Sequence, residues 1–151
     1  MPVQREFTRD LLQVMVFENR EALGALAAKM VSDKFKTLLQ KKSSINVIFA
    51  AAPSQSEFLN GLLNDPSVPW HSINAFHMDE YLGLPDHAIQ SFGNFLRNKL
   101  FNHVPLRSVN YIDGTCLDSK AECREAQKRR PAYSHRVTVR GRLLKTAIST
   151  S

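Results

Sequence analysis

The chain has 151 residues, which is enough for one domain with an apolar core and too few for two ordinary domains. Hydrophobic residues make up 43% of the chain and charged residues 23%, a composition that excludes an intrinsically disordered protein. No apolar run approaches the roughly 18 residues that span a bilayer, and the N-terminus lacks an apolar signal segment. We therefore expect a cytoplasmic protein without a membrane partner.

The net charge of +6 is distributed unevenly along the chain. Residues 1–119 contain 11 Lys/Arg and 12 Asp/Glu, whereas residues 120–151 contain 9 and 2. The basic excess therefore lies in the C-terminal segment, where Tyr133 is the sole aromatic residue. Nucleic acid is not the expected partner, although binding of DNA or RNA by this segment stays open as an alternative.

The first predicted elements alternate between strand and helix. Residues 11–17 are apolar and β-branched enough for a strand, and residues 19–41 have apolar side chains at helical spacing behind an Asn19 cap. Residues 45–51 form a continuous apolar run, which is typical of a buried parallel strand. Residues 57–63 predict a second helix, capped by one of the two serines that precede it, Ser54 and Ser56.

The alternation continues after a turn at residues 65–69. Residues 72–77 predict a strand, residues 88–102 a helix with one apolar face, and residues 109–112 a short strand. Strands that alternate with helices in this way are typical of a parallel sheet. The sequence thus predicts an α/β fold: a Rossmann-like open parallel sheet with helices on both faces.

The pattern changes near residue 125. A helix could begin at residues 120–127, but a basic run and Pro131 stop it, and no further strand is as apolar as residues 45–51. We therefore divide the chain into a domain at residues 1–125 and a divergent basic tail at residues 126–151.

Neither cysteines nor histidines suggest a metal or redox centre. Cys116 and Cys123 are too few for a disulfide framework, and no second Cys or His pair completes a zinc pattern. We therefore expect no metal. The histidine that precedes the acidic pair, His77, is expected to be structural.

Two adjacent carboxylates, Asp79 and Glu80, follow the predicted strand at residues 72–77. Ligands of open α/β sheets bind outside the carboxyl ends of the strands, where a carboxylate with a raised pKa suits proton transfer next to a carbonyl. Because neighbouring residues on extended chain point to opposite sides, only one of the two can face a given substrate. A solvated turn is the alternative reading of the same residues.

The second candidate site is the loop AAAPSQS, which ends at Ser56. Its small residues, including Ala52, let a ligand approach the backbone, and amides at a helix N-terminus attract phosphate. The hydroxyls of Ser54 and Ser56 could add hydrogen-bond donors. An ordinary helix cap needs no ligand, so both interpretations stay open.

These segments together resemble the glucosamine-6-phosphate deaminase (isomerase) family, within the superfamily that includes 6-phosphogluconolactonases. The match covers roughly residues 11–124 and rests on INVIFAAAPSQSEFLNGL, INAFHMDEYLGLPDHAIQSFGNFLRNKLFNHV and VNYIDGTCLDSKAECR. After the acidic pair the lactonase branch typically has an arginine, where this chain has Tyr81.

The resemblance implies a cofactor-free enzyme of amino-sugar catabolism that converts glucosamine 6-phosphate and water to fructose 6-phosphate and ammonia. Asp79 would move a proton between C2 and C1 of the opened sugar, and Glu80 would support the loop. The loop with Ala52, Ser54 and Ser56 would contact the phosphate, although the family version is rich in threonine and glycine.

The resemblance ends before the C-terminal segment. Family members continue with an apolar strand and a glycine-rich motif ending in histidine, which residues 125–151 do not contain. We therefore expect about half of the family domain and little or no turnover. The alternatives are a non-catalytic sugar-phosphate-binding or association fragment and a 6-phosphogluconolactonase-like hydrolase. A homo-oligomer is a further possibility for the association of the chain.

Overall fold

The computed structural model describes residues 3–85, 88–115, 118, 120, 121 and 124, and the backbone of residues 137–140 and 143–146. Cys116, Cys123 and most of the predicted helix at residues 120–127 lie outside this part of the chain. No helix within it is both long and apolar enough to cross a membrane.

The central sheet has three parallel strands, β3 (Ile45–Phe49), β4 (Ile73–His77) and β5 (Ser108–Asn110), in the order β3-β4-β5. Ile45 lies opposite Ile73, and Ala75 lies opposite Val109. The strands form because their alternate side chains are apolar and enter a common core. The predicted α/β class with an open parallel sheet is confirmed.

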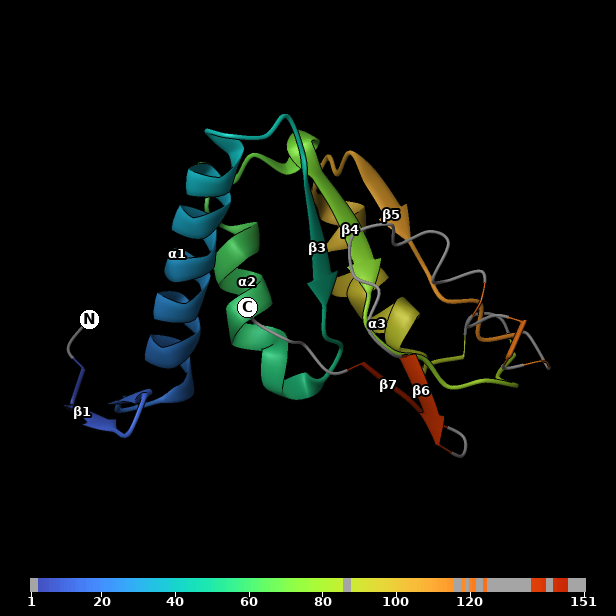
Figure 1. Cartoon of the computed structure of the whole chain (residues 1–151), viewed down its shortest axis with the longest axis horizontal. Helices are drawn as coiled ribbons and strands as arrows, with labels where there is room; N and C mark the ends of the chain where they lie inside the picture. The colour runs from blue at the N-terminus through green and yellow to red at the C-terminus, as the bar shows by residue number, and fades with distance from the viewer. Residues whose placement is uncertain are drawn as a thin grey trace.

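Three helices accompany the sheet: α1 (Arg20–Leu39), α2 (Ser56–Leu63) and α3 (Phe92–Lys99). Single 3₁₀ turns, η1 (Pro53–Gln55), η2 (Trp70–Ser72) and η3 (Phe101–His103), lie in the connections. Figure 1 shows α1 beside α2, with β3, β4 and β5 following across the molecule. Since each connection between neighbouring parallel strands contains a helix, the sheet is built from βαβ units.

One apolar core joins the sheet to all three described helices. Ile73 and Ala75 of β4 are fully buried in it, together with side chains from each helix: Ala28 and Phe35 of α1, Leu59 and Leu62 of α2, and Leu96 of α3. Ala28 and Phe35 are seven residues apart, which is two helical turns, and Leu59 and Leu62 are three apart. Ile73 and Ala75 are two apart, so each of these elements buries one face.

A row of polar side chains crosses the three strands, with one residue from each: Asn46, Asn74 and Ser108. The Asn74 amide donates to Asn46 Oδ1 at 2.9 Å, and the Ser108 hydroxyl donates to Asn74 Oδ1 at 2.9 Å. Asn74 thus bridges β3 and β5 across the middle strand, which satisfies half-buried polar groups that would otherwise weaken the sheet.

The chain begins with a hairpin that the sequence did not predict. β1 (Arg5–Arg9) pairs antiparallel with β2 (Leu12–Val16) in a separate two-stranded sheet. The predicted strand at residues 11–17 is therefore present, but its expected place in the parallel alternation is wrong. Asp10 has a φ of 53° and turns the chain so tightly that β2 pairs with the preceding residues instead.

Two further strands, β6 (Val137–Arg140) and β7 (Leu143–Thr146), lie within the predicted basic tail. They pair antiparallel with each other in their own sheet and do not extend the parallel one.

Candidate functional site

Loops from all three parallel strands meet at the carboxyl edge of the sheet. The Met78 amide, just after β4, donates to the Phe49 carbonyl at the end of β3 at 3.1 Å. The Gly83 amide donates to the Gly114 carbonyl at 2.7 Å, which joins the loop after β4 to the loop after β5. Parallel strands all end at this edge, so it is where a ligand site is expected.

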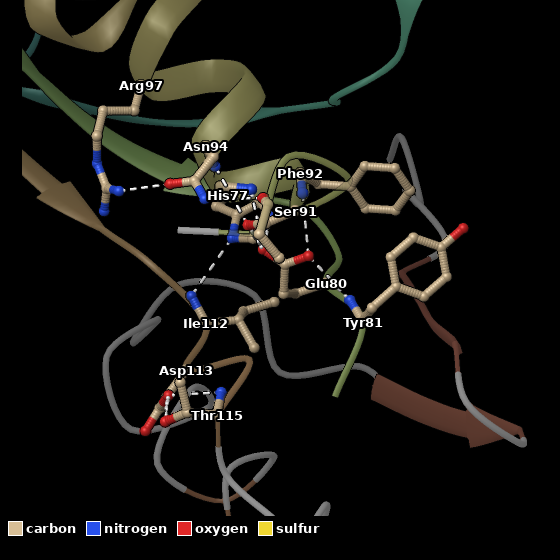
Figure 2. Close-up of polar contacts among 12 residues, drawn as sticks. His77, Glu80, Tyr81, Ser91, Phe92, Asn94, Arg97, Ile112, Asp113 and Thr115 are labelled. Carbon is tan, nitrogen blue, oxygen red and sulfur yellow. Dashed lines mark hydrogen bonds and ion pairs between the residues drawn. The ribbon is translucent and has the colours of Figure 1, made fainter. Parts of the chain in front are cut away.

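Glu80 is buried, with 3% of its surface exposed. One carboxylate oxygen accepts hydrogen bonds from the amides of Tyr81 (2.9 Å) and Phe92 (3.0 Å). The other accepts them from the Ser91 hydroxyl (2.7 Å) and the Gly93 amide (2.9 Å). Figure 2 shows the side chain of Glu80 directed from the loop after β4 towards Ser91 and Phe92 at the start of α3.

These hydrogen bonds give Glu80 a positioning role. A carboxylate has about four acceptor positions, and the four donors occupy that capacity. Three of the donors, at residues 91–93, belong to the start of α3, where amide groups have no partner within the helix and favour a negative charge. Glu80 therefore fixes the loop that carries Asp79.

Asp79 lies between the end of β4 and Glu80 and is half-buried. Its neighbour Glu80 turns towards α3, and successive residues of extended chain point to opposite sides. The Met78–Phe49 hydrogen bond keeps this segment next to the loop after β3, which carries the candidate phosphate-binding residues. The loops that carry the two predicted halves of the site therefore begin at neighbouring strand ends.

The candidate phosphate-binding residues occupy the entrance to α2. Ala52 is half-buried before η1, Ser54 is exposed within η1, and Ser56 is the half-buried first residue of α2. The prediction that one of the serines caps α2 is wrong: Gln55 is the N-cap and makes no side-chain cap bond. Pro53 begins a 3₁₀ turn that runs directly into the helix, so neither serine is used for capping.

Arg20 lies beside this loop, a placement the sequence did not predict. Its guanidinium donates to both carboxylate oxygens of Glu57, at 3.0 and 2.8 Å, and to the Pro53 carbonyl at 3.3 Å. The hydrogen bonds from Arg20 lower the pKa of the Glu57 carboxyl. Arg20, Ser54 and Glu57 line a groove of about 520 Å³ between α1 and α2. Thirty-seven positions separate Arg20 from Glu57, so no local pattern could have paired them.

His77 is fully buried at the end of β4. Its Nδ1 accepts a hydrogen bond from the Ile112 amide at 3.4 Å, and its ring meets that of Tyr111 edge to face. These contacts fit the predicted structural role. No group of three or more His, Cys, Asp or Glu side chains that could hold a metal ion occurs among the residues that the structure describes.

A separate cavity of about 180 Å³ lies on the other side of Glu80, between α3 and the loop after β5. Its wall includes Asn94, Arg97, Tyr111, Asp113 and Thr115; Figure 2 shows Arg97 and Asp113 around this region. Arg97 donates to Asn94 at 2.6 Å and its guanidinium lies 4.8 Å from the centre of the Tyr111 ring. Asp79, Ser54 and Ser56 do not line this cavity.

No family model matches the chain. Among curated proteins, glucosamine-6-phosphate deaminase of Mannheimia succiniciproducens is 40% identical over 68 residues, which cover 44% of this chain and 26% of that protein. Glucosamine-6-phosphate deaminase of Yersinia pestis is 24% identical over 128 residues, 81% of this chain and 48% of the relative. The longer of these two matches spans about half of the relative's length.

Solved structures of a glucosamine-6-phosphate deaminase and a 6-phosphogluconolactonase have a similar fold. A monomeric glucosamine-6-phosphate deaminase of the NagB superfamily superposes with a TM-score of 0.67 at 20% identity, covering 77% of this chain and 48% of that one. A 6-phosphogluconolactonase from Thermotoga maritima superposes with a TM-score of 0.64 at 23% identity, covering 74% and 51%. The chain is thus similar in sequence to glucosamine-6-phosphate deaminases and has, over about half of the length of these solved structures, the fold that the deaminase shares with the 6-phosphogluconolactonase.

Proposed function

We propose that the carboxyl edge of the sheet is a sugar-phosphate site of the glucosamine-6-phosphate deaminase type, with Asp79 as its proton-transfer group. The observation that carries the proposal is the 3.1 Å hydrogen bond from the Met78 amide to the Phe49 carbonyl. It joins the ends of β3 and β4, where the loop with Ser54 and Ser56 and the segment with Asp79 begin, and this shared edge supports a single ligand between them.

The chemistry follows from the two groups. A half-buried carboxylate at a strand end can take a proton from a carbon next to a carbonyl and return it to the neighbouring carbon, as an aldose–ketose conversion requires. The entrance to α2 supplies amides and two hydroxyls for a phosphate. Glu80, held by α3, keeps Asp79 in place rather than reacting.

We also propose that this chain alone has little turnover. General acid and base groups contribute about 10² to 10⁴ in rate each, and residues 125–151 contain no counterpart of the family's glycine-rich motif ending in histidine. Binding without appreciable reaction is the expected behaviour. The lactonase alternative has less support, because Tyr81 stands where that branch typically has an arginine.

Two measurements test the proposal. Calorimetric titration with glucosamine 6-phosphate should show saturable binding that Ser54→Ala and Ser56→Ala together weaken about tenfold, which corresponds to the loss of hydrogen bonds to a charged phosphate. An ammonia-release assay should show a low rate that Asp79→Asn abolishes while binding persists. Asp10→Asn, at the exposed hairpin turn, is the matched control and should change neither value.

The outcomes separate the parts of the proposal. Absence of saturable binding would overturn the sugar-phosphate site. Ammonia release that survives Asp79→Asn would overturn the role of Asp79, and rapid ammonia release would overturn the expectation of low turnover. Hydrolysis of 6-phosphogluconolactone in the same preparation would favour the lactonase alternative.

A further inference from the structure

The N-terminal hairpin has one charged strand and one strand without charge. β1 carries Arg5, Glu6 and Arg9, whereas β2 reads Leu-Gln-Val-Met-Val. Soluble proteins commonly protect the free edges of sheets with charged side chains, which oppose pairing with another chain. β1 has this protection and β2 lacks it.

The edge of β2 is also accessible. Within the described part of the chain, the sheet contains β1 and β2 alone, so β1 occupies one edge of β2 and no strand occupies the other. Leu12 is 65% exposed and Val16 is 40% exposed. An isolated two-stranded hairpin is marginally stable in water, and pairing with further strands is what ordinarily stabilises it.

A two-fold axis through Val14 would pair this edge with itself. In an antiparallel arrangement, Val14 lies opposite Val14 of the second copy and Leu12 lies opposite Val16 of the second copy. Phe7 already lies opposite Val14 inside the hairpin, so the apolar row would continue from one Phe7 to the other across four strands. No charged residue would face another.

The equivalent arrangement through the β1 edge is unfavourable. A two-fold axis at Phe7 would put Arg5 opposite Arg9 of the second copy, and like charges directly opposite each other destabilise a strand pair. The charge pattern therefore selects the β2 edge over the β1 edge.

We propose that two copies of this chain associate through antiparallel pairing of β2 with β2, which forms a four-stranded sheet across a two-fold axis. The second copy is favoured over an unrelated partner because the strand is complementary to itself in this register. β3 is another uncharged strand at the edge of a sheet, but its terminal residues Ile45 and Phe49 are both buried in the core.

Charge substitutions at Val14 provide the test, because Val14 of one copy would lie opposite Val14 of the second copy. In sedimentation velocity, the mass of the wild-type species should increase from 17.1 kDa to twice that value as the protein concentration is raised. Val14→Lys and Val14→Glu should each raise the dimer dissociation constant about tenfold, because each puts like charges face to face. An equimolar mixture of the two variants should recover dimers, now held by opposite charges.

Thr8→Lys is the matched control, since it adds the same charge to an exposed position of β1 in the same hairpin. It should leave the dimer unchanged, and circular dichroism should show that all variants keep the wild-type helix content. A wild-type chain that stays monomeric at every concentration overturns the proposal. A dimer that survives Val14→Lys also overturns the proposal and would indicate pairing at another edge, such as that of β3. A mixture of the Val14→Lys and Val14→Glu variants that stays monomeric overturns it as well.

Discussion

The Ser91 hydroxyl donates a 2.7 Å hydrogen bond to the buried carboxylate of Glu80, eleven residues earlier in the chain. The same hydroxyl accepts a hydrogen bond from the Asn94 amide at 3.2 Å and so caps α3. The capping residue and the buried acid therefore act together: Ser91 satisfies one amide of the helix end, while Glu80 accepts those of Phe92 and Gly93. Position 80 is consequently sensitive to the loss of its negative charge.

Glu80→Gln should reduce the free energy of unfolding by about 2–3 kcal/mol, because the side-chain amide would place a donor against backbone donors and leave them unsatisfied in a buried site. Urea denaturation followed by circular dichroism measures the change. Glu21→Gln, at an exposed position in the first turn of α1, is the control and should stay within about 0.5 kcal/mol of the wild type. An equal, small effect at both positions would contradict the capping role of Glu80.

Gly114→Ala should destabilise the site loops by about 2 kcal/mol, because the added Cβ would lie 2.8 Å from the Tyr81 carbonyl oxygen and 3.0 Å from Glu80 Cγ. Gly83→Ala is an informative comparison. Gly83 has a φ of 78° but no atom within 4 Å of an added Cβ, so the substitution should cost only the backbone strain of about 1 kcal/mol. In thermal denaturation, Gly114→Ala should have a lower melting temperature than Gly83→Ala. The reverse order would contradict the close contact between Gly114 and the Tyr81 carbonyl.

The stability of the chain should fall in acid through Asp65. Hydrogen bonds from Ser67 lower the pKa of the Asp65 carboxyl from 3.8 to about 2 in the folded chain. A depressed folded pKa stabilises the fold above pH 3.8, and this contribution disappears as the pH falls from 3.8 to 2.

Because Asp65 is half-buried and partly screened by water, we expect its contribution to be about 1 kcal/mol. Asp65→Asn should remove that amount at neutral pH and flatten the denaturation profile between pH 4 and 2, as followed by urea titrations at each pH. Asp10→Asn should leave the profile unchanged. An unaltered acid slope in Asp65→Asn would assign the pH dependence to other carboxyls.

Asn74→Ala should lower the free energy of unfolding by about 1–2 kcal/mol, since it removes the hydrogen bonds that join Asn46 to Ser108 through the middle strand. Asn98→Ala, at an exposed position of α3, is the control and should change stability by less than about 0.5 kcal/mol. If the two substitutions have the same effect, the polar row makes no net contribution to the sheet.

The sequence predicts the parallel core well because burial leaves a strong local signal. The apolar runs at residues 45–51 and 72–77 enclose β3 and β4, and the predicted helix at residues 57–63 differs from α2 by one residue. The helix predicted at residues 88–102 is longer than α3 at both ends. Ser91 caps the helix instead of continuing it, and the chain tightens into the 3₁₀ turn of Phe101–His103 after Leu100.

The hairpin and the site contacts lack such a signal. β1 reads Arg-Glu-Phe-Thr-Arg, which has too few apolar residues for an alternating pattern, so its pairing depends on the turn at Asp10. Glu80 and Asp79 can be singled out from their place after a strand. Which of the two is held by α3 depends on amides twelve and thirteen residues further along the chain, and only the folded structure brings these together.

The hydrogen bonds of Glu80 also bear on how this region opens. The first amides of a helix ordinarily exchange with solvent at once, since they have no acceptor within the helix. Here the Phe92 and Gly93 amides donate to the carboxylate of Glu80, which lies in the loop that follows β4. These hydrogen bonds can break only when this loop separates from the start of α3. In hydrogen–deuterium exchange, these two amides should therefore be protected as strongly as β4 itself, and the segment from β4 to the start of α3 should unfold and refold as a single cooperative unit.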